Sequence, residues 1–370
     1  MGHGGNILKA AREKGIDPFH IHDFSANISP LGFPEGLRQI LNDTVRKLSI
    51  YPDPEYHELR KAMATYSVTD KERIIPGNGA AQIIHDAIRF INPGKTMLPV
   101  PTFSEYEAAL RTTNSQITYF YNNPEQAFSL NETQLLHSMD ESFDLLVLCN
   151  PNNPTGALLS REAIFRILNH CHKIGCQVMI DEAFMDFVER EEHYSMVPFI
   201  AEWKNLIIVR AFTKVFAIPG IRLGYGVYGS LEKAKIHADQ MIPWSINTYA
   251  EAMKDFINTR EAKDYLEEVR EIIAYERKRL YQEIKQMENY HVFPSAVNFL
   301  LIQIKRTDKM TVKGLWNQLM EDGILIRDCS NFKGMPDDFF RIAVKNKEEN
   351  QRFIDSLKKA HETILCDKRC

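Results

Sequence analysis

The sequence lacks several features that identify large classes of protein. No uninterrupted apolar run approaches 18 residues, so we expect no membrane-spanning helix. Its 45 basic and 49 acidic residues leave a net charge of −4, which gives no basic surface of the kind that binds nucleic acid. The first residues, "MGHGGNILKAAREKG", contain no apolar core of a signal peptide. These absences favour a cytoplasmic protein.

Cysteine is also scarce. Six cysteines in 370 residues do not form a disulfide framework. Cys149 and Cys176 lie in apolar, strand-like runs and are expected to be small core residues. Cys366 and Cys370 end the chain in "CDKRC", and two thiols supply only half of a zinc site. We therefore predict a solvated C-terminal tail and no metal centre.

Short apolar runs alternate with amphipathic stretches between about residues 70 and 230. The stretch at 160–175 shows helical spacing of its apolar residues. The runs that read as buried strands are 96–100, 143–150, 176–183, 205–212 and 222–229. This alternation predicts an α/β fold with a mostly parallel central sheet and helices on both faces. Ligands bind at the carboxyl ends of such strands.

The pattern changes after residue 241. Residues 259–290 form a long, charged, helix-like stretch without Gly or Pro, followed by shorter strand patterns and a terminal helix. We predict a smaller α+β domain here. The expected organisation is an N-terminal segment (1–44) packed on the small domain, a large domain (45–240) and a small domain (241–370).

One lysine stands out in the apolar run "VRAFTKVFAIPGIRLGYGV", residues 209–227. Burying the amine of Lys214 would cost several kcal/mol unless it is paired or neutralised. Lys214 is either a surface lysine on a loop after a strand, or a lysine kept in a dry site to form a Schiff base with pyridoxal phosphate. The choice depends on the motifs around it.

Those motifs favour the Schiff base. A glycine turn precedes a helical pattern at 76–88, and helix N-termini bind phosphate. "NPNNPTG" at 150–156 places amide side chains after a buried strand, where a plain turn is the alternative. Asp181 ends the next strand, either as a helix N-cap or as a carboxylate that keeps a pyridine nitrogen protonated. Arg222 can bind a phosphate dianion bidentately.

In this order and at these intervals, "NPNNPTG", "DEAF", "TK" and "PGIRLGY" resemble the fold-type-I pyridoxal-phosphate enzymes of the class I/II aminotransferase group. The resemblance covers nearly the whole chain. It is strongest to the threonine-phosphate decarboxylases of cobalamin biosynthesis and to their near relatives, the histidinol-phosphate aminotransferases. "HGGN" (3–6), "DFSANISPLGFP" (23–34) and "PWSIN" (243–247) favour the decarboxylases.

The resemblance implies roles at the cofactor, pyridoxal 5'-phosphate. Lys214 would form the internal aldimine, and Asp181 would pair with the ring nitrogen. Tyr51, in "YPDPEY", would reach the phosphate from the partner subunit, which makes the protein a homodimer. The other implied cofactor contacts are Asn153 at the ring hydroxyl, Phe103 on the ring face, and Gly79, Ala80, Ala81, Thr213 and Arg222 at the phosphate.

The resemblance also implies a substrate site, with Arg341 at the carboxylate and His3, Asn27 and Arg327 at a phosphate. The implied reaction is decarboxylation of L-threonine O-3-phosphate, or L-serine O-phosphate, to the amino-alcohol phosphate of the cobamide nucleotide loop. Transamination of histidinol phosphate remains open, because the residue types suit both reactions. A non-catalytic regulator or binding protein of this fold is a further alternative, although no basic helical segment precedes residue 70.

Three departures from the group's pattern concern the cofactor. Phe184 stands where many aminotransferases have a tyrosine that hydrogen-bonds the ring oxygen. Ala80 and Ala81 offer only backbone donors to a phosphate, and Ala211 lacks a hydroxyl that many relatives direct at it. Phosphate binding is therefore expected to depend more on Arg222 and the helix N-terminus.

Overall fold

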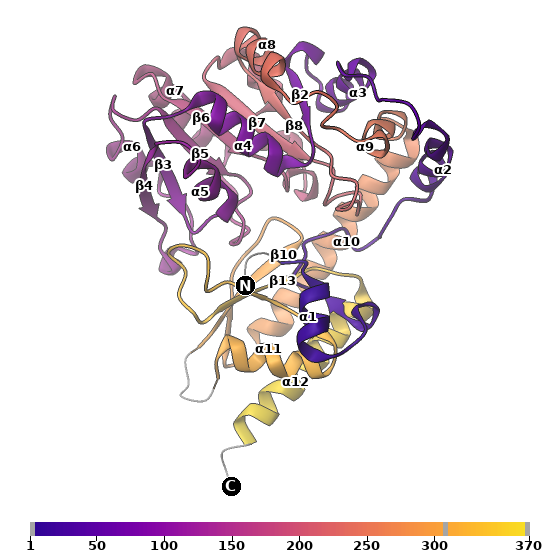
Figure 1. Ribbon diagram of the computed structural model, residues 1–370. Helices are drawn as coiled ribbons and strands as arrows, with labels where there is room; N and C mark the ends of the chain where they lie inside the picture. The colour runs from indigo at the N-terminus through magenta and orange to yellow at the C-terminus, as the bar shows by residue number, and fades with distance from the viewer. Residues whose placement is uncertain (1–3, 306–309, 367–370) are drawn as a thin grey trace.

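The computed structural model describes residues 4–305 and 310–366, with side chains up to residue 360, so His3 and the Cys366–Cys370 thiols lie outside what is described. A large α/β layer structure lies above a smaller sheet with its own helices (Figure 1). The central seven-stranded sheet has the order β2-β8-β7-β6-β5-β3-β4. Its strands are β2 (Ile74–Gly77), β3 (Lys95–Val100), β4 (Gln116–Tyr121), β5 (Leu145–Cys149), β6 (Gln177–Asp181), β7 (Leu206–Ala211) and β8 (Gly224–Tyr228).

Most of this sheet is parallel, which confirms the predicted fold class. Strands β4, β3, β5, β6 and β7 run parallel to one another, whereas β8 is antiparallel to both β7 and β2. The run at 222–229 is thus a strand of opposite direction.

The sequence analysis did not predict two strands of the central sheet. β2 contains Pro76 and Gly77, which read as a turn, and β4 is a half-exposed edge strand without a long apolar run.

Helices cover both faces of the sheet. Successive residues of a strand point to opposite faces: Ile207 of β7 packs with Ile83 of α4, whereas Ile208 packs in the cluster that contains Ile164 of α7. The first face carries α4 (Ala80–Ile91), α5 (Ser104–Leu110) and α8 (Leu231–Gln240), and the second carries α3 (His57–Ser67) and α7 (Arg161–Lys173). Further short helices in the part of the chain around this sheet are α2 (Glu35–Thr44), α6 (Glu132–His137) and α9 (Thr248–Ala252).

The smaller region is built from both ends of the chain. Its four-stranded sheet consists of β12 (Arg327–Asp328), β13 (Phe339–Ala343), β10 (Phe299–Ile304) and β9 (Tyr290–Val292), all antiparallel. A separate pair joins β1 (His22–Asp23) to β11 (Ile324–Leu325) in parallel. The helices of this region are α1 (Ile7–Lys14), α11 (Val312–Glu321) and α12 (Lys347–Cys366). Residues Ala10 and Phe24 are buried in its apolar core.

The long helix α10 (Arg260–Lys285) connects the two regions (Figure 1). Leu266 and Ile273 on its first part are buried in the core of the large sheet, and Leu280 and Ile284 on its last part are buried in the core of the smaller one. Leu37 of α2 also belongs to the larger core. The domain limits 1–44, 45–240 and 241–370 stay a prediction. Among the described helices, none is both long and apolar enough to cross a bilayer.

Candidate active site

The register of three strands brings distant motifs to one edge of the central sheet. Gly224 at the start of β8 lies opposite Ala211 at the end of β7 and Gly77 at the end of β2. Because β8 is antiparallel, its first residues meet the carboxyl ends of the strands beside it. The segments that follow Gly77 and Ala211 therefore meet the segment that precedes Gly224.

A cradle of donors forms at this edge. Gly79 caps the N-terminus of α4 with φ of +82°, and a Cβ atom there would lie 2.5 Å from Nη2 of Arg222. A Cβ atom on Gly224 would lie 2.5 Å from the backbone nitrogen of Ala80. Both positions thus require glycine. The first N–H groups of a helix have no partner within it, so Ala80 and Ala81 offer backbone donors beside a guanidinium.

Asp181 ends β6 and is buried. Its Oδ2 accepts a 2.6 Å hydrogen bond from the Tyr106 hydroxyl, and its Oδ1 accepts one of 2.9 Å from the Ala183 N–H. Burial raises the pKa of Asp181 to about 6, and these two hydrogen bonds act in the opposite direction. The sequence analysis missed Tyr106. Its spacing of three from Phe103 at the start of a helix was the available signal.

Lys214 lies three residues beyond β7, and Thr213 before it is buried. Burial, followed by the charges of Arg341 and Arg222, lowers the pKa of Lys214 to about 8. An amine with this pKa is partly neutral near pH 8 and can act as a nucleophile or exchange a proton.

The N-terminal segment forms a wall of the site beside Lys214. The Ser29 N–H donates to the Lys214 carbonyl oxygen at 3.0 Å. Upstream, one carboxylate oxygen of Asp23 accepts from the Ser25 N–H at 2.8 Å and the Ser25 hydroxyl at 2.6 Å, which fixes the turn. Asn27 is 3% exposed, and its Oδ1 has no hydrogen-bond partner among the described residues. A buried acceptor of this kind can bind a water molecule or a donor group of a ligand.

Two buried arginines stand on neighbouring strands. Arg327 on β12 is the register partner of Arg341 on β13. Arg341 donates to Asn153 Oδ1 and, at 3.1 Å, to the Ser25 carbonyl oxygen, and its guanidinium lies 5.0 Å from the centre of the Phe299 ring. Burial lowers the pKa of Arg341 to about 10. Sequence-distant Asn153 and Arg341 are thus brought into direct contact.

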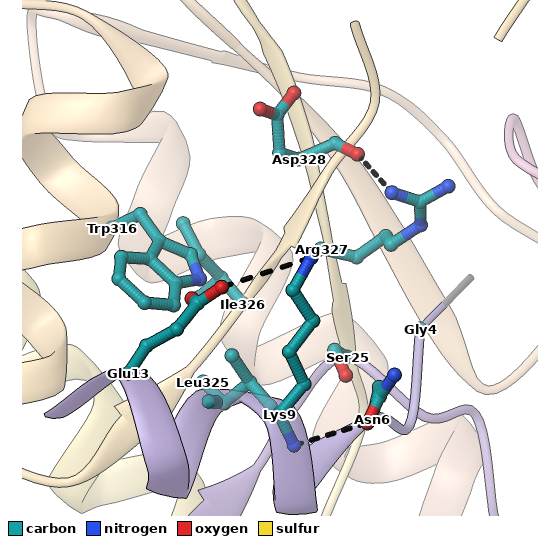
Figure 2. Close-up of a pocket in the computed structure, with 11 residues that line it drawn as sticks. Gly4, Asn6, Lys9, Glu13, Ser25, Trp316, Leu325, Ile326, Arg327 and Asp328 are labelled. Carbon is teal, nitrogen blue, oxygen red and sulfur yellow. Dashed lines mark hydrogen bonds and ion pairs between the residues drawn. The ribbon is translucent and has the colours of Figure 1, made fainter. Parts of the chain in front are cut away.

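Arg327 is held by its own loop. Its guanidinium donates to the Asp328 carbonyl oxygen at 2.5 Å and to Asn331 Oδ1 at 2.7 Å, and it lies 5.0 Å from the centre of the Phe332 ring. Figure 2 shows the cavity beside Arg327, with α1 along one side and Trp316 of α11 along another. This cavity of about 40 Å³ accommodates water molecules but not an amino acid.

Two asparagines of "NPNNPTG" stabilise the loop, and the third contacts Arg341. Asn152 Nδ2 donates to the Pro101 carbonyl oxygen at 3.0 Å, and Asn150 Oδ1 accepts from the Leu159 N–H at 2.8 Å. These bonds fix the loop. A Cβ atom on Gly156, which has φ of +75°, would lie 2.2 Å from Ser295 Oγ, so the loop end also needs glycine. Asn153 is the asparagine that faces Arg341.

Three aromatic residues named in the sequence analysis have the following contacts and exposure. The Phe103 ring meets the Tyr106 ring edge-on, with centroids 5.7 Å apart. Phe184 is buried and edge-on to Phe299 at 5.2 Å. Tyr51 is 78% exposed, and its ring lies 4.9 Å from that of Trp244.

A buried ion network supports the segment that follows β6. Arg210 of β7 is 5% exposed and contacts Glu182 at 3.0 Å, Asp186 at 2.8 Å and Glu191 at 3.1 Å. The sequence analysis did not identify it, although an arginine inside an apolar strand requires buried partners. The network fixes the chain directly after Asp181.

Comparison with known proteins decides the family. The family model for aminotransferase class I and II matches residues 20–357. The chain belongs to this family. It is 36% identical over 99% of its length to a protein of Caldanaerobacter subterraneus provisionally named threonine-phosphate decarboxylase, of which it covers 96%. It is 32% identical over 96% of its length to the threonine-phosphate decarboxylase of Salmonella typhimurium, of which it covers 95%.

A solved structure shows the same fold. The histidinol-phosphate aminotransferase of Clostridium acetobutylicum superposes with a TM-score of 0.84 at 31% identity, covering 92% of this chain and 99% of the other. As for the family, the cofactor is pyridoxal 5'-phosphate. The site fits this group, because it offers an amine of lowered pKa at Lys214, a buried carboxylate at Asp181 and a donor cradle at Gly79 and Arg222. The individual residue roles stay predictions.

Proposed function

We propose that the protein decarboxylates L-threonine O-3-phosphate, or L-serine O-phosphate, to the corresponding amino-alcohol phosphate. The observation that carries the proposal is the pair of buried arginines, Arg327 and Arg341, directly opposite each other across two strands. A phosphorylated amino acid has two anionic groups, and the pair offers one guanidinium to each. The 32–36% identity to proteins named threonine-phosphate decarboxylase supports the same substrate.

In this proposal Arg341 binds the substrate carboxylate. It contacts Asn153 and the Ser25 carbonyl oxygen, which orient its guanidinium, and Phe299 packs beneath it. Arg327 binds the phosphate together with Asn27, whose buried Oδ1 has no described partner, and with His3, which lies outside the described residues. Asn27 then binds a phosphate through its amide nitrogen and uses Oδ1 for a water or a protonated group.

Lys214 and Asp181 act at the cofactor. When bound, pyridoxal phosphate accepts the electron pair of a bond broken at the substrate's Cα. Lys214 holds the cofactor aldehyde and later donates a proton to Cα, for which a pKa of about 8 is well suited. Asp181 keeps the ring nitrogen protonated. Overall, the carboxylate leaves as CO2 and Cα gains one proton.

The orientation of the bound substrate determines which bond at its Cα breaks. By holding both ends of the substrate, the two arginines would fix the torsion at Cα and so would determine which bond the bound cofactor activates. Tyr51 would complete each phosphate cradle from the partner subunit of a homodimer. Its 78% exposure in one chain leaves its ring available to a second copy.

Transamination of histidinol phosphate is the second candidate, and the match to the histidinol-phosphate aminotransferase structure favours it. The test is to incubate the holoenzyme with threonine phosphate, with serine phosphate, and with histidinol phosphate plus 2-oxoglutarate. We expect CO2 and the amine product from the first. Threonine and serine phosphate differ by one methyl group, worth about 1–3 kcal/mol in a pocket, so the two rates should differ only modestly. A keto acid as the main product, or turnover of histidinol phosphate alone, would overturn the proposal.

A further inference from the structure

Helix α5 places a fully buried tyrosine against Asp181. The Tyr106 hydroxyl donates to Asp181 Oδ2 at 2.6 Å, and Tyr106 has no exposed surface. Phe103 caps the N-terminus of the same helix three residues earlier, and the two rings meet edge-on. Residues three apart share a helix face. One turn therefore carries both the phenylalanine predicted to stack on the cofactor ring and the partner of the carboxylate.

The hydrogen bond leaves Asp181 able to bind a second donor. Each carboxylate oxygen has two acceptor positions. Tyr106 uses one on Oδ2 and the Ala183 N–H uses one on Oδ1, at 2.9 Å. Two fixed donors determine the plane of the carboxylate and leave one position on each oxygen for the cofactor.

We propose that Tyr106 is a positioning residue, which orients the Asp181 carboxylate toward the cofactor's ring nitrogen through its hydrogen bond to Oδ2. The inference rests on the proposed role of Asp181. It adds to that role a residue which contacts neither the substrate nor the reacting carbon and acts through the carboxylate alone.

The other groups around Asp181 do not replace Tyr106. On β5, the register partner is Cys149, and burial raises the pKa of its thiol to about 12, so it is neutral. On β7, the register partner is Val209, which is apolar. Glu182, the next residue, raises the pKa of Asp181 by its charge, although Arg210 binds it at 3.0 Å. The Tyr106 hydroxyl therefore offsets both burial and a neighbouring negative charge.

The test is the pH dependence of cofactor affinity in Tyr106→Phe. Removing a hydrogen bond to the ionised form raises the pKa of Asp181 above its value of about 6, by roughly one unit. More of the apoprotein is then protonated at Asp181 in mild acid. By equilibrium dialysis of apoprotein with pyridoxal phosphate, we expect affinity about tenfold below the parent at pH 5.5, and within about twofold of it at pH 8.5.

Two further variants separate this inference from the proposed function. Tyr225→Phe also removes a buried hydroxyl, here one bonded to Ser67 Oγ at 2.7 Å, and should follow the parent at both pH values. Asp181→Asn should bind cofactor weakly at both. If Asp181→Asn binds as tightly as the parent, the role of Asp181 fails. If Asp181→Asn is weak but Tyr106→Phe follows the parent at both pH values, or falls equally at both, the Tyr106 inference is wrong and the proposed function stands.

A second substitution retains the hydroxyl and so does not depend on Tyr106→Phe folding. Site-specific 3-fluorotyrosine at position 106 makes the phenol a stronger donor, which lowers the pKa of Asp181. We expect a change of opposite sign, a gain in cofactor affinity of about twofold at pH 5.5 with none at pH 8.5. An unchanged or lowered affinity at pH 5.5 would overturn the inference.

Discussion

Arg327 and Arg341 lie directly opposite each other on strands β12 and β13, and each is only 5% exposed. Like charges in this arrangement repel each other, and burial removes water from both guanidinium groups. The proximity of Arg327 is one of the causes that lower the pKa of Arg341 to about 10, after burial. Two anionic groups of one substrate would relieve both costs. The pair therefore suits the proposed substrate, which has two anionic groups.

We predict that Arg327→Met lowers kcat/KM for threonine phosphate by roughly 30- to 1,000-fold, because a buried, charge-assisted contact of about 2–4 kcal/mol is lost. Methionine retains the apolar stem beside Phe332. Part of the loss should appear in kcat, since binding energy at the remote phosphate is used for orientation. Free threonine, which lacks the phosphate, should react at an almost unchanged rate. Steady-state kinetics with both substrates measures this.

A matched control for this prediction is Arg38→Met, at an exposed arginine paired with Glu35. It should leave both substrates unaffected. An Arg327→Met enzyme that still prefers the phosphorylated substrate to the same degree would remove Arg327 from the phosphate site.

We predict that Lys214 binds the cofactor covalently through its ε-amino group. Borohydride reduction of the holoenzyme followed by peptide mapping should label the peptide that contains Lys214 and no other. Label on another lysine, or on none, would contradict this assignment. The lowered pKa of about 8 supports it, because a neutral amine is the nucleophile.

We predict that Arg222 is a principal anchor of the cofactor phosphate, since Ala80, Ala81 and Ala211 bring no hydroxyl groups. Arg222→Ala should weaken cofactor binding by about 2–4 kcal/mol, which corresponds to roughly 30- to 1,000-fold. Dialysis of the holoenzyme measures the loss. Arg89→Ala, at the far end of α4 with its side chain 60% exposed, is the control and should retain cofactor like the parent.

We predict that Lys214 destabilises the apoprotein below pH 8. Its pKa falls from 10.5 in the unfolded chain to about 8 in the fold, so the unfolded state binds more protons between these values. Stability therefore rises with pH through this window. At pH 7 the free energy of unfolding of Lys214→Met should be about 2 kcal/mol higher than that of the parent apoprotein, after allowance for partial exposure of the lysine.

This advantage of Lys214→Met should shrink as the pH rises from 8 toward 10.5. Urea unfolding of both apoproteins at pH 7 and pH 9.5 measures it. Lys235→Met, at an exposed lysine on α8, should show no such trend. A difference that is constant with pH would show that Lys214 loses no protonation on folding.

We predict a homodimer whose sites are completed by Tyr51 of the neighbouring subunit. Tyr51 and Trp244 line a hollow of about 500 Å³ together with Leu48 and Ile221, and the nearby Ile242 side chain is 71% exposed. Exposed apolar side chains gathered in this way favour an interface. Mixing inactive Lys214→Ala with inactive Tyr51→Phe chains should restore part of the activity, because one site of the mixed dimer has both original residues. Sedimentation as a monomer at assay concentration would rule out this arrangement.

Local sequence was sufficient for much of the fold. The buried strands β3, β5, β6 and β7 are continuous apolar runs, and α7 and α10 show helical spacing, so each was predicted close to its observed bounds. Such elements are set by side-chain pattern over five to a dozen neighbours. The direction of strand β8 was not predicted, because an apolar run does not specify whether the strand runs parallel or antiparallel to its partner.

The site divides in the same way. Lys214, Asp181 and the glycine before α4 could be proposed from sequence because each sits in a short motif beside a strand end. Tyr106 and Arg210 were not proposed, since their partners lie 75 residues and 19–28 residues away, respectively. The spacing of Tyr106 from Phe103 indicates a shared helix face, but it does not specify which carboxylate the hydroxyl meets.

The sequence by itself determined which residue types the protein has for its chemistry and in what order they follow along the chain. The tertiary structure decided their relations: Arg341 against Asn153 and Ser25, Arg327 opposite Arg341, and Tyr106 on Asp181. Apart from the pairing of Arg327 with Arg341 on neighbouring strands, these contacts join segments 75 to 316 residues apart in the chain. Their positions depend on strand order and register, which are fixed by the packing of whole faces and not by any one segment.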